Sequence, residues 1–168
     1  VLTATLSAPA DKTFFISYVI RCILPYQLNA NSIMIIANAI AAKCLTEGVT
    51  EIVLGRDGRL SGPDVMHSLS LGLRARGIDI VNVGLVTSPL LYFAAKKINS
   101  KSGVMITGSH NPKDYNGFKI VINDSPVSGT EILSLLSNKP LRVNSPGREV
   151  IKKDLMDDNV AFQMMLNC

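Results

Sequence analysis

The chain has 168 residues, enough for one domain with a hydrophobic core or for one domain and the beginning of a second. Hydrophobic residues make up 47%, but the apolar runs are too short, or too interrupted by Arg21 and Pro25, to cross a bilayer, so we expect a soluble protein with no membrane partner. The net charge of +4 includes no basic run longer than two residues and aromatic residues make up only 5%, which argues against a nucleic-acid partner and favours a small anionic ligand.

The cysteines and the N-terminus give no sign of export. Cys22, Cys44 and Cys168 are far apart, odd in number and outside any C-x-x-C spacing, so we predict buried thiols in preference to metal ligands. The N-terminus has no basic segment before a short apolar core, and Asp11 lies where a secretory signal avoids acid. We therefore expect a cytoplasmic protein.

The chain begins, after a polar lead, with a predicted strand and a predicted helix. The apolar and aromatic run at 13–20 is typical of a strand. Residues 29–48 have apolar side chains at helical spacing, with Asn31 or Ser32 as the N-cap and Gly48 at the end of the helix.

Helices and strands continue to alternate as far as residue 122. The remaining predicted elements are a strand at 51–55, a helix at 63–76, a strand at 78–84, a helix at 89–97, and strands at 103–107 and 117–122. This order predicts an α/β fold with three layers, α/β/α, and a mixed, mostly parallel sheet covered by helices on both faces.

Beyond Asp124 the pattern weakens. Residues 129–139 favour a short helix, whereas residues 140–150 are rich in turn formers and indicate a link or an irregular edge. Val160–Leu166 form an apolar face that needs a partner, which predicts self-association. We expect one domain over 1–140, followed over 141–168 by a linker and the truncated start of a second domain.

Three polar loops follow predicted strands or precede helices, at 55–62, 86–89 and 107–117. Ligands of open α/β sheets bind beyond the carboxyl ends of the strands, so each loop is a candidate site. In "GRDGRLSG" two arginines, Arg56 and Arg59, flank an Asp57-Gly58 turn, an arrangement suited to binding phosphate and to fixing neighbouring loops, or to a plain surface turn with solvated arginines. The "VTSP" loop is explained more simply as a helix N-cap followed by proline.

The loop "TGSHNPKDYNG" at 107–117 carries the densest polar chemistry. Gly108 allows a sharp bend before Ser109, and Asn116 with Gly117 favours a left-handed turn back into a strand. This frame presents Ser109. His110 is its immediate neighbour and G-x-S-x-G is absent, so a hydrolase nucleophile elbow is not expected.

Two further features leave alternatives open. The side chains of Ser109, His110 and Asn111 either serve a ligand or bond only to the loop backbone. In "GFKIVI" strand alternation places Lys119 on the face opposite Phe118, where it must snorkel, form an ion pair or act chemically. At a strand end facing the loop, desolvation would lower the pKa of Lys119 and suit it to proton transfer.

The motifs "TGSHNP", "DYNGFKIV" and "GRDGRLSGP", in this order and spacing, resemble those of the α-D-phosphohexomutases. The similarity spans Phe15 to about Ile122 and is greatest to the bacterial phosphomannomutase/phosphoglucomutase branch. The family fold implies four domains in a longer chain, with this sequence matching the first.

The resemblance implies a role for each matching residue. Ser109 would carry a phosphoryl group to and from a glucose or mannose 1- or 6-phosphate, and would bind Mg²⁺ through that phosphate. Lys119 would act as general acid or base, with Arg21 from the family's N-terminal element also in the catalytic set. The other residues that would shape the loop or support the substrate are Tyr18, Arg56, Asp57, Arg59, His110, Asn111 and Asn116.

The sequence departs from the family pattern in two places. In "FFISYVIRC" the positions 16, 19 and 22 hold Ile, Val and Cys where the family has Arg, Asp and Gly. The Asp-Gly-Asp-Gly-Asp-Arg loop that holds Mg²⁺ does not occur in the sequence, and "DLMDD" has the wrong spacing to replace it. Because phosphoryl transfer relies on positioning and charge neutralisation, we expect the isolated chain to be inactive.

A different class of function is also compatible with the sequence. The chain could be a stand-alone, non-catalytic domain that binds phosphosugars or a protein partner. A dinucleotide-binding domain is a more distant alternative, because no G-x-G-x-x-G motif follows a strand.

Overall fold

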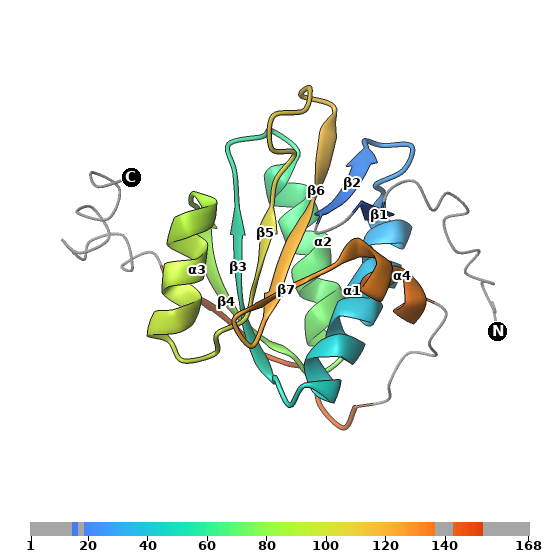
Figure 1. Cartoon of the computed structure of the whole chain (residues 1–168). Helices are drawn as coiled ribbons and strands as arrows, with labels where there is room; N and C mark the ends of the chain where they lie inside the picture. The colour runs from blue at the N-terminus through green and yellow to red at the C-terminus, as the bar shows by residue number, and fades with distance from the viewer. Residues whose placement is uncertain (1–14, 17–18, 137–142, 153–168) are drawn as a thin grey trace.

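The computed structural model describes residues 15–16, 19–136 and 143–152, which form a mixed sheet of eight strands with helices on both of its faces (Figure 1). This confirms the predicted α/β class. The elements in chain order are β1 (Phe15–Ile16), β2 (Val19–Ile23), α1 (Ala30–Thr46), β3 (Glu51–Arg56), α2 (Gly62–Arg74), β4 (Asp79–Leu85), α3 (Ser88–Lys97), β5 (Gly103–Ile106), β6 (Tyr115–Ile122), β7 (Ser125–Val127), α4 (Gly129–Leu135) and β8 (Glu149–Ile151).

The sheet has a parallel part and an antiparallel part. Its strand order is β1-β2-β6-β5-β3-β4-β8, and β7 pairs with β6 outside this path. Strands β5, β3, β4 and β8 run parallel, whereas β6 is antiparallel to β5, β2 and β7. The carboxyl ends of β3, β4 and β5 therefore meet at one edge of the sheet.

Two hydrophobic clusters hold the layers together. Helices α1 and α2 cover one face, where Phe118, Ile120 and Ile122 of β6 are buried, and α4 packs against α1 (Figure 1). On the other face α3 packs against β3 and β5, over a smaller cluster that includes Met105. The prediction that helices cover both faces of the sheet is correct at β3 and β5. On β6, in contrast, Lys119 and Val121 are only half-buried.

The helix ends show which sequence signals decide a boundary. The N-cap of α1 is Asn29, not Asn31 or Ser32 as predicted, because the Asn29 side chain accepts from the Ser32 N–H at 3.0 Å while Ser32 Oγ accepts from the Asn29 N–H at 2.9 Å. Gly48 follows the helix with φ +73°, as predicted. A cap residue that can pair reciprocally with a neighbour three positions on is preferred to one that cannot.

The N-terminal strand and the segments after residue 124 differ from the prediction. Where a single strand was expected at 13–20, the described residues belong to two strands, β1 and β2, and β2 continues to Ile23. Residues 125–127 form β7, which was not predicted. In the turn-rich segment 140–150, the alternative of a sheet edge is correct for Glu149, which starts β8 beside β4. The apolar face Val160–Leu166 lies outside the described residues, so self-association stays a prediction.

Gly117 is required for close approach between strands. The predicted left-handed turn at Asn116-Gly117 is wrong, since both residues lie inside β6 and neither has a positive φ. Gly117 is opposite Arg21 on β2, and a Cβ at Gly117 would collide with the carbonyl oxygen of Ile20. Glycine therefore sets the distance between β2 and β6.

The described cysteines are structural. Burial raises the pKa of both the Cys22 and the Cys44 thiol to about 12, so both are neutral and unreactive at neutral pH. This agrees with the predicted buried thiols, while Cys168 lies outside the described residues. No helix in the described part of the chain is both long enough and apolar enough to cross a membrane.

A polar cluster attaches β8 to the rest of the fold. The Glu149 carboxylate accepts from Ser70 Oγ at 2.8 Å and from Asn82 Nδ2 at 2.9 Å, and Arg74 Nη1 is 3.4 Å away. Burial is the largest single influence and raises the pKa of Glu149, but the bonds from Asn82 and Ser70 and the charges of Arg74 and His67 outweigh it, so the pKa is lowered overall. The ionised carboxylate stabilises the fold.

We expect Gly117→Ala to lower the free energy of unfolding by about 2 kcal/mol or more, because β2 must move away from the new methyl group. Chemical denaturation measures this change. Gly58→Ala is the matched control, since a Cβ at Gly58 meets no atom within 4 Å. Equal losses in the two variants would show that the β2–β6 distance does not depend on Gly117.

We also expect Glu149→Gln to cost about 1 kcal/mol at neutral pH, since the ionised acceptor is lost. The folded pKa is below the ordinary 4.5, so this stabilisation is complete above that pH and is lost as the pH falls through the folded value. Denaturation midpoints of the wild type and the variant should therefore converge in acid. A difference that persists unchanged in acid would contradict the ionised role of Glu149.

Candidate functional site

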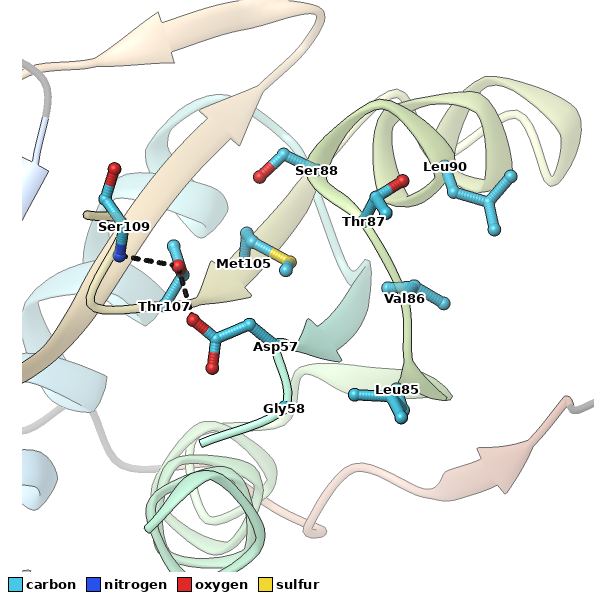
Figure 2. A pocket seen from close by; sticks show the side chains of 10 residues that line it. All are labelled: Asp57, Gly58, Leu85, Val86, Thr87, Ser88, Leu90, Met105, Thr107 and Ser109. Carbon is cyan, nitrogen blue, oxygen red and sulfur yellow. Dashed lines mark hydrogen bonds between the residues drawn. The ribbon is translucent and has the colours of Figure 1, made fainter. Parts of the chain in front are cut away.

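A cleft of about 550 Å³ lies at the edge of the sheet where β3, β4 and β5 end (Figure 2). Residues after β3 and β5 supply polar side chains, and the connection from β4 into α3 supplies much of the apolar surface. The lining residues are Asp57, Gly58, Leu85, Val86, Thr87, Ser88, Leu90, Met105, Thr107 and Ser109. All three loops selected from the sequence therefore contribute to one site, as expected for strand carboxyl ends.

Ser109 is exposed at the rim of this cleft in an unusual backbone conformation. Its φ of 55° lies in the left-handed region, which is uncommon for residues other than glycine and is found at functional sites. Figure 2 shows the Ser109 nitrogen directed toward Thr107 and the hydroxyl on the opposite side. The distance from Ser109 Oγ to His110 Nδ1 is 3.4 Å, a weak contact between exposed side chains.

Thr107 and Asp57 form a chain of hydrogen bonds behind Ser109. The Ser109 N–H donates to Thr107 Oγ1 at 2.8 Å, and Thr107 Oγ1 donates to Asp57 Oδ2 at 2.7 Å (Figure 2). Asp57 also accepts from the backbone N–H of Arg59 at 3.1 Å and from Arg59 Nε at 3.2 Å. Both carboxylate oxygens are thus already bound within the protein.

The Arg59 guanidinium fixes the loop 107–117. Nη1 donates to the carbonyls of Pro112 and Tyr115, at 2.6 and 2.9 Å. Nη2 donates to the carbonyls of Ser109 and Asn111, each at 2.8 Å. Together with the Nε bond to Asp57, these contacts use all five N–H groups of the side chain. These contacts support the prediction that the 55–62 loop fixes a neighbouring loop, and they show that Arg59 is not a solvated arginine of a plain surface turn.

Glycine at position 108 makes this contact possible. A Cβ at Gly108 would collide with the guanidinium of Arg59. The φ of Gly108 is not positive, so the residue is needed for close approach of the arginine. Asn111 closes the loop from the other side, donating to the Gly108 carbonyl from Nδ2 at 2.9 Å and from its backbone N–H at 3.0 Å.

Asn116 and Arg56 support the site from behind. Asn116 is fully buried; its Nδ2 donates to Ser61 Oγ at 3.0 Å, which ties β6 to the start of α2. Arg56 Nη1 donates to the carbonyl of Asp57 at 3.1 Å. These contacts agree with the supporting roles predicted for both residues, which themselves stay predictions.

Arg21 and Lys119 lie on the sheet face that also carries Met105. Lys119 is the register partner of Met105, which lines the cleft. Arg21 is the register partner of Gly117, and Gly117 places no side chain between Arg21 and Lys119. Lys119 lies in the middle of β6 and not at its end. Both side chains are half-buried, and Arg21 Nε is buried without a hydrogen-bond partner among the described residues. Tyr18 lies outside the described residues.

Comparison with known protein families identifies this arrangement. Residues 13–137 match the family model "Phosphoglucomutase/phosphomannomutase, alpha/beta/alpha domain I". The chain belongs to the phosphoglucomutase/phosphomannomutase family. The resemblance inferred from the motifs is therefore confirmed, and domain I is the part that matches.

Individual members of the family agree with this match. The chain is 48% identical over 130 residues to a phosphoglucomutase of Neisseria gonorrhoeae and 46% identical over 130 residues to a phosphomannomutase/phosphoglucomutase of Pseudomonas putida. Each match covers 77% of this chain and 28% of the relative. A solved structure of a phosphoglucomutase/phosphomannomutase family protein from Burkholderia thailandensis superposes with a TM-score of 0.78, at 32% identity, over 88% of this chain and 34% of that one.

Sequence reasoning missed three contributors to the domain I site. The sequence gives Thr107 no assigned role, although a hydroxyl two residues before the exposed serine is a usable signal. Ser61 has no local signal beyond its place in a turn, since its partner Asn116 is distant in the chain. The "VTSP" loop was explained as a helix cap, and Thr87 does precede α3, but its side chain makes no capping bond and lines the cleft.

We expect Arg59→Lys to loosen the loop 107–117, because a single ammonium cannot span four carbonyls and a carboxylate. Amide hydrogen exchange should become at least about tenfold faster at residues 109–115, since several hydrogen bonds are lost together. Arg56→Lys is the matched control, because within the described part of the chain the Arg56 side chain donates to the Asp57 carbonyl and not to the loop 107–117. Unchanged exchange in Arg59→Lys would mean that the loop holds its own conformation.

Proposed function

We propose that the chain is the phosphoserine-bearing domain of a phosphohexomutase and that Ser109 carries the phosphoryl group between C1 and C6 of a glucose or mannose phosphate. The observation that supports this most directly is the exposed Ser109 hydroxyl, held in a left-handed conformation at the rim of a cleft by a loop with fixed backbone contacts. The relatives carry the printed names phosphoglucomutase and phosphomannomutase/phosphoglucomutase, and this chain spans 28% of their length.

The proposed step is a balanced exchange of one phosphoryl group. Ser109 Oγ bonds to the phosphorus of a hexose bisphosphate as the bond from phosphorus to the sugar oxygen breaks, and the proton of Ser109 is transferred to the departing oxygen through a general acid/base. In the reverse direction a sugar hydroxyl takes the group from phosphoserine. Lys119 is the proposed acid/base, because the residue is half-buried, has no ion-pair partner among the described residues and is the register partner of the cleft residue Met105.

The cationic side chains divide into two functions in this proposal. Arg59 is fully engaged with the protein itself, so it holds the loop and does not bind the sugar phosphate. Arg21 shares a sheet face with Lys119 and has a buried Nε without a described partner, so it is the proposed phosphate ligand. His110 and Asn111 shape the loop around Ser109.

Mg²⁺ is implied by the family, but the described residues do not provide a site for it. They include no group of three or more His, Cys, Asp or Glu side chains that could hold a metal ion. Both oxygens of Asp57, the carboxylate of the cleft, are occupied by Arg59 and Thr107. The proposed step is therefore derived from the side chains alone, and the inactivity of the isolated chain stays a prediction.

We expect the purified chain to show no mutase turnover, yet to gain slowly, during long incubation with glucose 1,6-bisphosphate, the mass of one phosphoryl group on Ser109. Intact mass and peptide mapping measure this, and Ser109→Ala should abolish it. Ser134→Ala, which removes an exposed hydroxyl on α4, is the matched control and should keep the modification. An unmodified Ser109 in a chain that still binds the phosphosugar would favour the non-catalytic binding domain instead.

A further inference from the structure

The hydroxyl of Thr107 lies between the two loops that build the cleft. Thr107 follows β5 directly and is 6% exposed, and its backbone N–H donates to the Gly117 carbonyl of β6 at 3.0 Å. Its Oγ1 is 2.7 Å from Asp57 Oδ2 on one side and 2.8 Å from the Ser109 nitrogen on the other. Thr107 is therefore held by three hydrogen bonds: one from its backbone N–H, one that Oγ1 donates and one that Oγ1 accepts, the last two drawn in Figure 2.

The direction of these two bonds is determined by chemistry. An ionised carboxylate only accepts hydrogen bonds, so the single hydrogen of the Thr107 hydroxyl points to Asp57. A lone pair of the oxygen is then directed to the Ser109 N–H, which only donates. We call the hydrogen bonds from Ser109 through Thr107 to Asp57 the relay. The backbone N–H and Nε of Arg59 hold the Asp57 carboxylate in place, so the 55–62 loop sets the direction of the relay.

This relay acts on the backbone group that sets the conformation of Ser109. Thr107 fixes the plane of the 108–109 peptide at the Ser109 N–H, and Arg59 Nη2 holds the Ser109 carbonyl on the other side, so the two contacts together hold the torsion φ of Ser109 at 55°. A left-handed serine is strained, and a hydrogen bond to its N–H is of comparable free energy to that strain. Without the bond, the ordinary right-handed or extended conformations compete, and each turns the hydroxyl in a different direction.

We propose that Thr107 is a positioning residue for the phosphoryl carrier: through its hydroxyl, Asp57 holds Ser109 in the left-handed conformation that directs Oγ away from the sheet. Thr107 and Asp57 take no part in the proton transfer, because all their hydrogen-bonding atoms in the cleft are already paired with protein groups. The catalytic consequence rests on the proposed function, whereas the conformational consequence does not.

Nuclear magnetic resonance of the 168-residue chain tests the conformational part. In Thr107→Val, which keeps the shape and removes the hydroxyl, the three-bond coupling between the N–H and Hα of Ser109 should leave its left-handed value. The exchange of this amide should become about tenfold faster, the size of one lost hydrogen bond. Thr107→Ser restores the hydroxyl and should restore both readouts. Thr87→Val, the same change in the same cleft at a hydroxyl without a capping bond, should leave Ser109 unaltered.

Asp57→Asn tests the same relay from its other end without altering Thr107. In Asp57→Asn one acceptor oxygen replaces two, so the amide NH2 faces either the Arg59 backbone N–H or the donors Thr107 Oγ1 and Arg59 Nε. The lost acceptor should shift the coupling and exchange of Ser109 in the same direction as Thr107→Val does. A left-handed, protected Ser109 in either folded variant would overturn the proposal. If Thr107→Val does not fold, Asp57→Asn and Thr107→Ser decide it.

The rate at which glucose 1,6-bisphosphate phosphorylates Ser109 tests the catalytic consequence. The rate should fall roughly tenfold in Thr107→Val and stay within about twofold of wild type in Thr107→Ser. A wild-type chain that is never phosphorylated contradicts the proposed function and leaves the conformational test to decide the role of Thr107. Equal rates in wild type and Thr107→Val overturn the catalytic consequence.

Discussion

The bonds of one arginine hold the candidate site together. Arg59 directs four N–H groups to backbone carbonyls of the loop 107–117 and the fifth to Asp57, so two loops that are about fifty residues apart in sequence form one rigid unit. The loop itself has no regular secondary structure between β5 and β6 to fix it. The conformation of Ser109 is therefore a result of tertiary contacts, with the parallel strands β3 and β5 as the common base.

The complete engagement of Arg59 with the protein has a functional consequence. Because Arg59 is saturated by the protein, the cations available to an anionic ligand beside the cleft lie elsewhere, and Arg21 with Lys119 on the partly uncovered face of β2 and β6 are suited to that role. The rigid loop keeps the exposed serine still, so little conformational entropy is lost when a ligand meets it. Such preorganisation is what the phosphoryl carrier that we propose would require.

Local sequence patterns predicted the alternation of helices and strands, the end of α1 at Gly48 and the exposure of Ser109 on its loop. Each of these features depends on residues that are close together in the sequence. Features that depend on distant partners were not predictable in this way. Gly117 is required by a carbonyl on β2, and β8 is fixed by the contacts of Glu149 with α2 and β4. The fivefold bonding of Arg59 belongs to the same class, since the sequence shows the arginine but not the carbonyls it meets.

A double-mutant cycle between Arg59 and Asp57 tests the central claim most directly. The opening free energy of the loop amides at 109–115, from hydrogen exchange, is measured in wild type, Arg59→Lys, Asp57→Asn and the double variant. If the two side chains hold the loop as one unit, their effects are non-additive, with a coupling of about 0.5 to 3 kcal/mol. Additive effects would contradict the account, because each side chain would then act on the loop independently.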